Sequence, residues 1–142
     1  MNIALRGTSR VVLVALGTGL LLVSTFVGYS SAHTVSRATS LSIDKIPSRA
    51  THPGDRVLIV GELGPRKCED GQTITLKQVR PGVDPVLGTD KTDGDGEYRF
   101  RINPNNDMKV YTRFAGSVDS SYGHSHTCEK SKSARVKVNV TG

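Results

Sequence analysis

Apolar and polar residues alternate along short stretches of the chain, and this period of two limits the fold more than any other feature. In the clearest stretch, residues 98–102 read Tyr-Arg-Phe-Arg-Ile, so one face is apolar and the other is charged. Beyond residue 32, no stretch of helical length carries an apolar stripe with a period of 3.6. We therefore expect strands rather than helices.

Turn-forming residues separate these stretches, as in Pro53-Gly54-Asp55 and Asp93-Gly94-Asp95-Gly96. About seven short strands divided by such turns within about 100 residues are typical of a β-sandwich. Between the last two strands, residues 116–133 read as a long polar loop. The expected strands are residues 41–44, 56–62 (a central strand buried on both sides), 73–79, a short edge strand at 86–87, 98–102, 109–115 and 134–140.

The first 32 residues have the composition of a secretory signal peptide. Arg6 and Arg10 precede an uncharged run over residues 11–27, and Ser30-Ser31-Ala32 supplies a small-x-small cleavage site. We expect a signal helix over residues 1–32 that is cleaved after Ala32, and a secreted or extracellular protein. The alternative is a retained anchor that holds the protein at the cell surface, because the run approaches the length that spans a bilayer.

The remaining chain divides into a polar, flexible stem over residues 33–40 and one domain over residues 41–142. The whole sequence has 19 basic and 13 acidic residues. Without Arg6 and Arg10 the basic residues number 17, which leaves a net charge of +4. A mild surplus of positive charge gives a protein a weak preference for binding anionic cell walls or membranes. No basic stripe with interleaved aromatic residues is present, so we expect no nucleic-acid partner.

The two cysteines, Cys68 and Cys128, both follow the expected cleavage site, and an even count in an oxidising compartment predicts a disulfide. Cys68 falls between the second and third expected strands, and Cys128 falls between the last two. In an immunoglobulin-type Greek key these two loops emerge at the same end. A bridge that closes about 60 residues contributes roughly 4 kcal/mol in the chain-entropy model.

Three segments resemble bacterial Ig-like modules: residues 54–61 (Gly-Asp-Arg-Val-Leu-Ile-Val-Gly), 92–100 (Thr-Asp-Gly-Asp-Gly-Glu-Tyr-Arg-Phe) and 111–116 (Tyr-Thr-Arg-Phe-Ala-Gly). The second segment is also similar to the hairpin of carboxypeptidase-regulatory-like domains. The resemblance implies a single Ig-like Greek-key β-sandwich over roughly residues 41–140. Such modules serve as spacers, adhesins and substrate-binding accessories, so it implies no particular ligand. The chain departs from the usual pattern in its cysteine pair and in having one module.

Two clusters are candidates for metal binding. His124 and His126 alternate beside Cys128, so they could bind copper or zinc from one side of an extended segment. Their spacing matches no standard zinc pattern, and the other interpretation is a plain disulfide beside exposed histidines. Asp93 and Asp95 suggest calcium, but neither register fits an EF-hand loop. The other interpretation there is a hairpin turn whose side chains accept from local backbone amides.

No nucleophile motif or paired catalytic arrangement is recognisable, so we expect neither an enzyme nor a cofactor. The expected function is that of an exported, monomeric, non-enzymatic module acting in interaction or structure at the cell surface or in the medium. Its partner would be a protein or a cell-envelope ligand, and it would contact the membrane only through an uncleaved N-terminal segment. The alternative is a metal-binding exported protein using His124 and His126. The candidate binding loops are residues 64–71 and 116–133, with Arg66, Lys67, Tyr122, His124 and His126.

Overall fold

The computed structural model describes residues 33–121 and 124–142, and the signal peptide expected over residues 1–32 lies outside them. Within the described residues the one helical element is a 3-10 turn, η1 (Arg66–Cys68), which confirms an all-β fold. No helix in this described part has the length and apolar character needed to cross a membrane. The strands are β1 (Thr34–Arg37), β2 (Ser40–Leu41), β3 (Asp44–Ile46), β4 (Val57–Gly64), β5 (Thr73–Gln78), β6 (Val86–Lys91), β7 (Glu97–Ile102), β8 (Met108–Phe114), β9 (Ser117–Ser121), β10 (His124–Cys128), β11 (Ser131–Lys132) and β12 (Val136–Val138).

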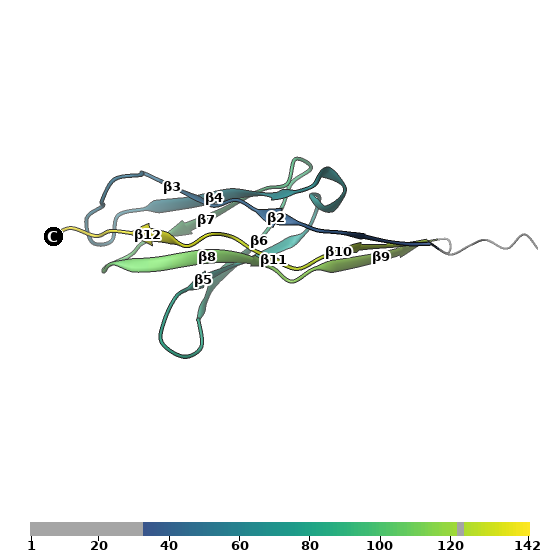
Figure 1. Cartoon of the computed structure of the whole chain (residues 1–142). Helices are drawn as coiled ribbons and strands as arrows, with labels where there is room; N and C mark the ends of the chain where they lie inside the picture. The colour runs from purple at the N-terminus through teal and green to yellow at the C-terminus, as the bar shows by residue number, and fades with distance from the viewer. Residues whose placement is uncertain (1–32, 122–123) are drawn as a thin grey trace, which may run out of the picture.

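Two sheets form the body of the sandwich (Figure 1). In the first sheet, β4 pairs with β7 on one side and with β2 and β3 on the other. In the second sheet, β8 pairs with β5 on one side and with β11 and β12 on the other, and β6 extends the sheet beyond β5. The chain therefore crosses between the sheets after β4, after β6 and after β7, as a Greek-key sandwich requires.

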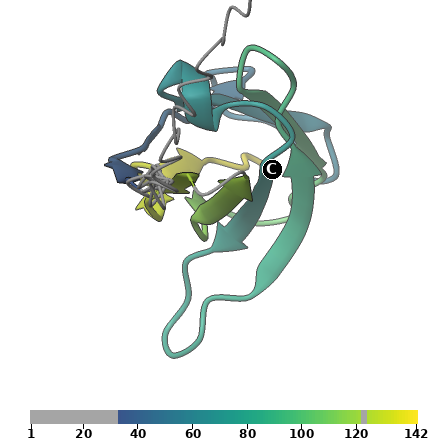
Figure 2. The same ribbon diagram turned by 90° about the vertical axis from the view of Figure 1, so that its right-hand side faces the viewer.

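A third, smaller sheet of β1, β10 and β9 continues the molecule beyond one end of the sandwich as a narrow extension (Figure 1). β9 and β10 form an antiparallel hairpin, and β1 runs parallel to β10 with Val35 opposite His126. The C-terminus lies at the opposite end of the molecule. Figure 2 views the sandwich from the end that carries this extension.

The core lies between the two main sheets and follows the alternation in the sequence. Tyr98 and Phe100 of β7 are buried, whereas Arg99 and Arg101 are exposed, as the pattern predicts. One cluster joins side chains from both sheets, which is what holds the layers together. Its buried members are Leu41, Val57, Ile59, Leu63, Cys68, Ile74, Leu76, Tyr98, Phe100, Val110, Phe114, Cys128 and Val138.

Several local expectations differ from the structure. The expected strand over residues 41–44 is divided into β2 and β3, which both pair with β4. β4 is fully buried on one face only, because its alternate side chains, such as Leu58 and Val60, are half-buried. The edge strand β6 runs to Lys91 instead of ending at Leu87. Residues 116–133 contain β9, β10 and β11 instead of an irregular loop. Residues 34–37, expected within a flexible stem, form β1 because they pair with β10.

Candidate binding surfaces

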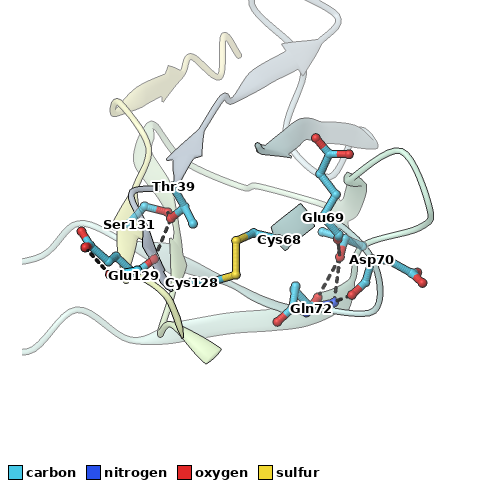
Figure 3. The surroundings of a disulfide bond; sticks show 10 residues. Thr39, Cys68, Glu69, Asp70, Gln72, Cys128, Glu129 and Ser131 are labelled. Carbon is cyan, nitrogen blue, oxygen red and sulfur yellow. Dashed lines mark hydrogen bonds between the residues drawn. A yellow bond between two sulfur atoms is a disulfide. The ribbon is translucent and has the colours of Figure 1, made fainter. Parts of the chain in front are cut away.

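The predicted disulfide is present, and it joins η1 to the base of the β9–β10 hairpin (Figure 3). Both half-cystines are buried. Next to the bridge, Thr39 Oγ1 lies 2.7 Å from the carbonyl oxygen of Glu129 and 2.7 Å from Ser131 Oγ. The chain before β2 is thereby fastened to the segment after Cys128. Three segments that are distant in sequence thus meet at one end of the sandwich.

A cavity of about 400 Å³ lies beside the disulfide, between η1 and the small sheet. Arg66, Lys67 and His126, all expected as binding residues, line it together. Asp70 and Asp119 also line it, so the cavity carries both signs of charge. Arg37 of β1 faces it as well, and the buried Nε of Arg37 has no hydrogen-bond partner among the described residues. The cavity therefore retains an unused donor.

The other expected residues lie elsewhere. His124 lies farther out on the hairpin and contacts His33, with 3.2 Å between the two Nδ1 atoms. Tyr122 lies outside the described residues. In the part of the chain that the structure describes, no three His, Cys, Asp or Glu side chains cluster in a way that could hold a metal ion.

The acidic turn before β7 has the contacts expected of a hairpin turn. Asp93 Oδ1 accepts hydrogen bonds from the backbone amides of Asp95, at 3.1 Å, and Glu97, at 2.9 Å. This carboxylate is therefore already engaged in holding the local backbone.

A second surface covers the outward side of the sheet formed by β5, β8, β11 and β12. Inward residues such as Leu76, Val110 and Val138 are buried, so the residues between them point outward. Lys130 joins this surface because it lines a hollow of about 410 Å³ with Tyr111 and Lys132. We call this surface the basic face, and its cations are Lys77, Lys109, Arg113, Lys130, Lys132 and Lys137.

Like charges stand directly opposite each other on the basic face. Lys132 of β11 is in register with Arg113 of β8, and Lys137 of β12 is in register with Lys109 of β8. Like charges at directly opposed positions destabilise a sheet. Of these four cations, Lys137 alone forms an ion pair, at 3.2 Å from Asp107 Oδ2.

Two aspartates interact with the basic face at its edges. The backbone amide of Arg80 and then the hydroxyl of Tyr111 hold the pKa of Asp84 below its usual value. The backbone amide of Val140 and then Lys137 lower the pKa of Asp107. Both carboxylates therefore stay ionised at neutral pH and lower the local charge without cancelling it.

At the centre of the basic face, Tyr111 is almost buried although it points outward. Its hydroxyl donates to Asp84 Oδ2 at 2.9 Å, and Lys132 Nζ lies 3.8 Å from the centre of its ring. Burial, and then the hydrogen bond to Asp84, raise the pKa of the Tyr111 hydroxyl. The aromatic ring thus holds one cation of the face in a defined position.

Sequence reasoning did not identify the basic face, although a signal for it exists. Its cations on β5, β8 and β12 each stand next to a core residue, as in Leu76-Lys77 and Lys109-Val110, so each of these can be assigned to an outward position. Lys132 stands between two serines and carries no such signal. The alternation of apolar and polar residues does not show which strands pair with each other. Only the register shows that cations from separate strands stand side by side.

No known protein family matches the chain, and no curated protein is similar to it in sequence. Among solved structures, the chain is similar to the sulfur carrier protein SoxY from Chlorobium limicola f thiosulfatophilum. The alignment covers 77% of this chain and 84% of that chain, with 13% sequence identity and a TM-score of 0.43.

Proposed function

We propose that the protein is an exported, non-enzymatic binding module that attaches to anionic polymers of the cell envelope through its basic face. The observation that carries this proposal is the pair of like-charge neighbours, Arg113 with Lys132 and Lys109 with Lys137. Such pairs cost stability when nothing is bound. A polyanion laid across the sheet would convert this repulsion into attraction.

The distribution of charge supports the same proposal. Six cations and the carboxylates of Asp84 and Asp107 leave a surplus of four positive charges on the basic face. Residues 33–142 contain 17 basic and 13 acidic residues, so their whole surplus is also four. The remaining charges of this part of the chain balance. A single sheet face would thus provide the attraction for an anionic partner.

A polymer suits this surface better than a small anion. Exposed ion pairs are individually weak, at about 0–1 kcal/mol each. Several pairs made at once by one chain of repeated anionic groups add up, because the first contact raises the effective concentration of the others. Binding of this type weakens as salt screens the charges. We expect modest, salt-sensitive affinity.

The experiment measures co-sedimentation with purified cell-wall sacculi that carry their anionic polymers, and with the same sacculi stripped of them. We expect the protein to sediment with the first and to stay in the supernatant with the second. The test variant is Lys109→Gln/Arg113→Gln, which keeps the Lys137–Asp107 ion pair and the contact of Lys132 with Tyr111. Its binding should fall at least about tenfold, which corresponds to about 1.4 kcal/mol.

The matched control is Arg49→Gln/Arg56→Gln, which removes the same charge from exposed positions next to β3 and β4. It should bind almost as well as the original protein. Equal losses in both variants would mean that net charge alone governs binding, and the basic face would then not be the site. Binding to stripped sacculi, or to vesicles of anionic lipid in preference to the polymer, would also overturn the proposed ligand.

A further inference from the structure

Two histidines that are 91 residues apart in the sequence meet on the narrow extension. His33 directly precedes β1, and His124 begins β10. Because β1 runs parallel to β10 with Thr34 opposite Ser125, the two histidines stand side by side. Their Nδ1 atoms are 3.2 Å apart, and their ring centres are 4.6 Å apart.

This spacing is that of two ligands on one metal ion. Imidazole nitrogens bind zinc at about 2.0–2.1 Å. Two such nitrogens stand roughly 2.8–3.4 Å apart when the angle at the metal lies between square-planar and tetrahedral values. The observed 3.2 Å falls within that interval. Both side chains are exposed, so an ion can reach them from solvent.

We propose that cleavage after Ala32 completes a copper(II) site from the α-amino group of His33, His33 Nδ1 and His124 Nδ1. The site rests on the export step of the proposed function, because the free amino group exists only once residues 1–32 are removed. The amino nitrogen and Nδ1 of one histidine close a six-membered chelate ring around a metal, whereas Nε2 of that residue points away. The nitrogen of His33 that faces His124 is Nδ1, as this chelate requires.

The chemistry of the donors selects the metal. Three nitrogen donors suit copper(II), which also stands highest in the affinity order of the divalent first-row metals. Cys68 and Cys128 are joined in a disulfide and so supply no thiolate. Within the described residues, side chains alone do not assemble three such ligands. The α-amino group is therefore what turns a histidine pair into a chelating site.

This assignment differs from the His124–His126 pair that the sequence suggested. His126 lies on the same face of β10 but lines the cavity with Arg66 and Lys67. Its cross-strand neighbours are Val35 on β1, which offers no donor atom, and Asp119 on β9, which offers oxygen and no further nitrogen donor. The partner of His124 is instead His33, which the sequence places 91 residues away.

The test produces the full chain with its own leader in a secreting host and determines the first residue of the product by intact mass. The product is then titrated with copper(II), followed by calorimetry and electron paramagnetic resonance. We expect a product that begins at His33 and binds one equivalent of copper in a tetragonal, nitrogen-rich environment. His124→Ala should weaken binding at least about 100-fold, the upper end of the effect of losing an outer-shell partner.

A second variant removes the amino group from the site without changing either histidine. A Gly-Ser-Gly-Ser insertion between Ala32 and His33 moves the new N-terminus away, and we expect the same loss of affinity. His126→Ala and His52→Ala serve as controls and should bind copper like the original protein. His52 is exposed and hydrogen-bonded locally to Asp55, so its removal tests for non-specific histidine binding.

The outcomes separate the site from the export step. A product that begins at His33 but binds copper equally well with His124→Ala, or with the insertion, overturns the site and leaves export standing. A product that retains residues 1–32 overturns cleavage, and the site falls with it because the amino group is missing. The intact mass distinguishes these two failures.

Discussion

The Cα atoms of Cys68 and Cys128 lie 5.8 Å apart although 60 residues separate them in the sequence. The bridge joins the 3-10 turn after β4 to the base of the β9–β10 hairpin. Both candidate features of this end, the mixed-charge cavity and the histidine pair, stand on segments near that bridge. The disulfide therefore connects the sandwich covalently to its extension.

Removal of this disulfide should lower the stability of the whole domain. We expect Cys68→Ala/Cys128→Ala to lose about 4 kcal/mol of unfolding free energy, because the bridge closes a long loop in the unfolded chain. Urea unfolding of the variant and of the original protein, with and without reductant, measures the difference. Equal midpoints for all samples would show that the bridge adds nothing to stability.

Gly61 of β4 lies where the Tyr98 side chain crosses the strand. A Cβ at this position would collide with the Ser42 carbonyl oxygen and would lie 2.6 Å from Tyr98 Cζ. We expect Gly61→Ala to cost about 1–3 kcal/mol, the usual range for overpacking a core. The control is Gly88→Ala in β6, where the nearest atom is Phe100 Cδ1 at 3.7 Å. Thermal unfolding should separate the two variants, and similar losses would contradict the collision.

The sequence predicted the elements that alternate and missed those that do not. The segment 98–102 has a regular apolar face, so its strand and its orientation follow from the pattern. The hairpin of β9 and β10 carries polar residues at most positions, because much of it faces solvent, and it therefore reads as a loop. β1 forms only through its pairing with β10. No local pattern encodes a partner so far away in the chain.

The candidate sites also divide into those that local sequence patterns predict and those that depend on long-range strand pairing. The cysteine bridge could be predicted because two cysteines in an exported chain favour a disulfide, and both fall in loops expected at the same end of the sandwich. Arg66, Lys67 and His126 were expected to lie together and do so. The contact between His33 and His124, and the opposed cations of the basic face, depend on strand register. Register is set by long-range pairing, which alternation does not specify.

Tyr98 should make the protein sensitive to alkali. Its hydroxyl lies 2.7 Å from Thr112 Oγ1 and donates to the Ser42 carbonyl, and burial raises its pKa to about 12. An unfolded tyrosine titrates near pH 10. Below about pH 10 the hydroxyl is neutral in both states, and its stabilising effect is complete. Between pH 10 and 12 the unfolded chain loses the proton first, so a rise in pH favours unfolding.

The measurement is the urea midpoint between pH 9 and 11.5 for the original protein and for Tyr98→Phe. The original protein should lose up to about 1.4 kcal/mol per pH unit from this group within that window. Tyr98→Phe should be less stable at pH 9, because it lacks the hydrogen bonds, and should decline less steeply above pH 10. Parallel pH profiles would show that Tyr98 does not govern the alkaline transition.

The opposed cations of the basic face should cost stability when no ligand is bound. Lys109→Gln/Arg113→Gln removes one member of each like-charge pair and keeps the ion pair of Lys137 with Asp107. We expect a gain of about 0.2–1 kcal/mol per pair at low salt. The gain should shrink as salt is added, since the repulsion is screened within about 10 Å at 0.1 M salt. Chemical unfolding at two salt concentrations measures it. A loss of stability at low salt would mean that these cations contribute to packing, and it would contradict a role for their repulsion in binding an anionic polymer.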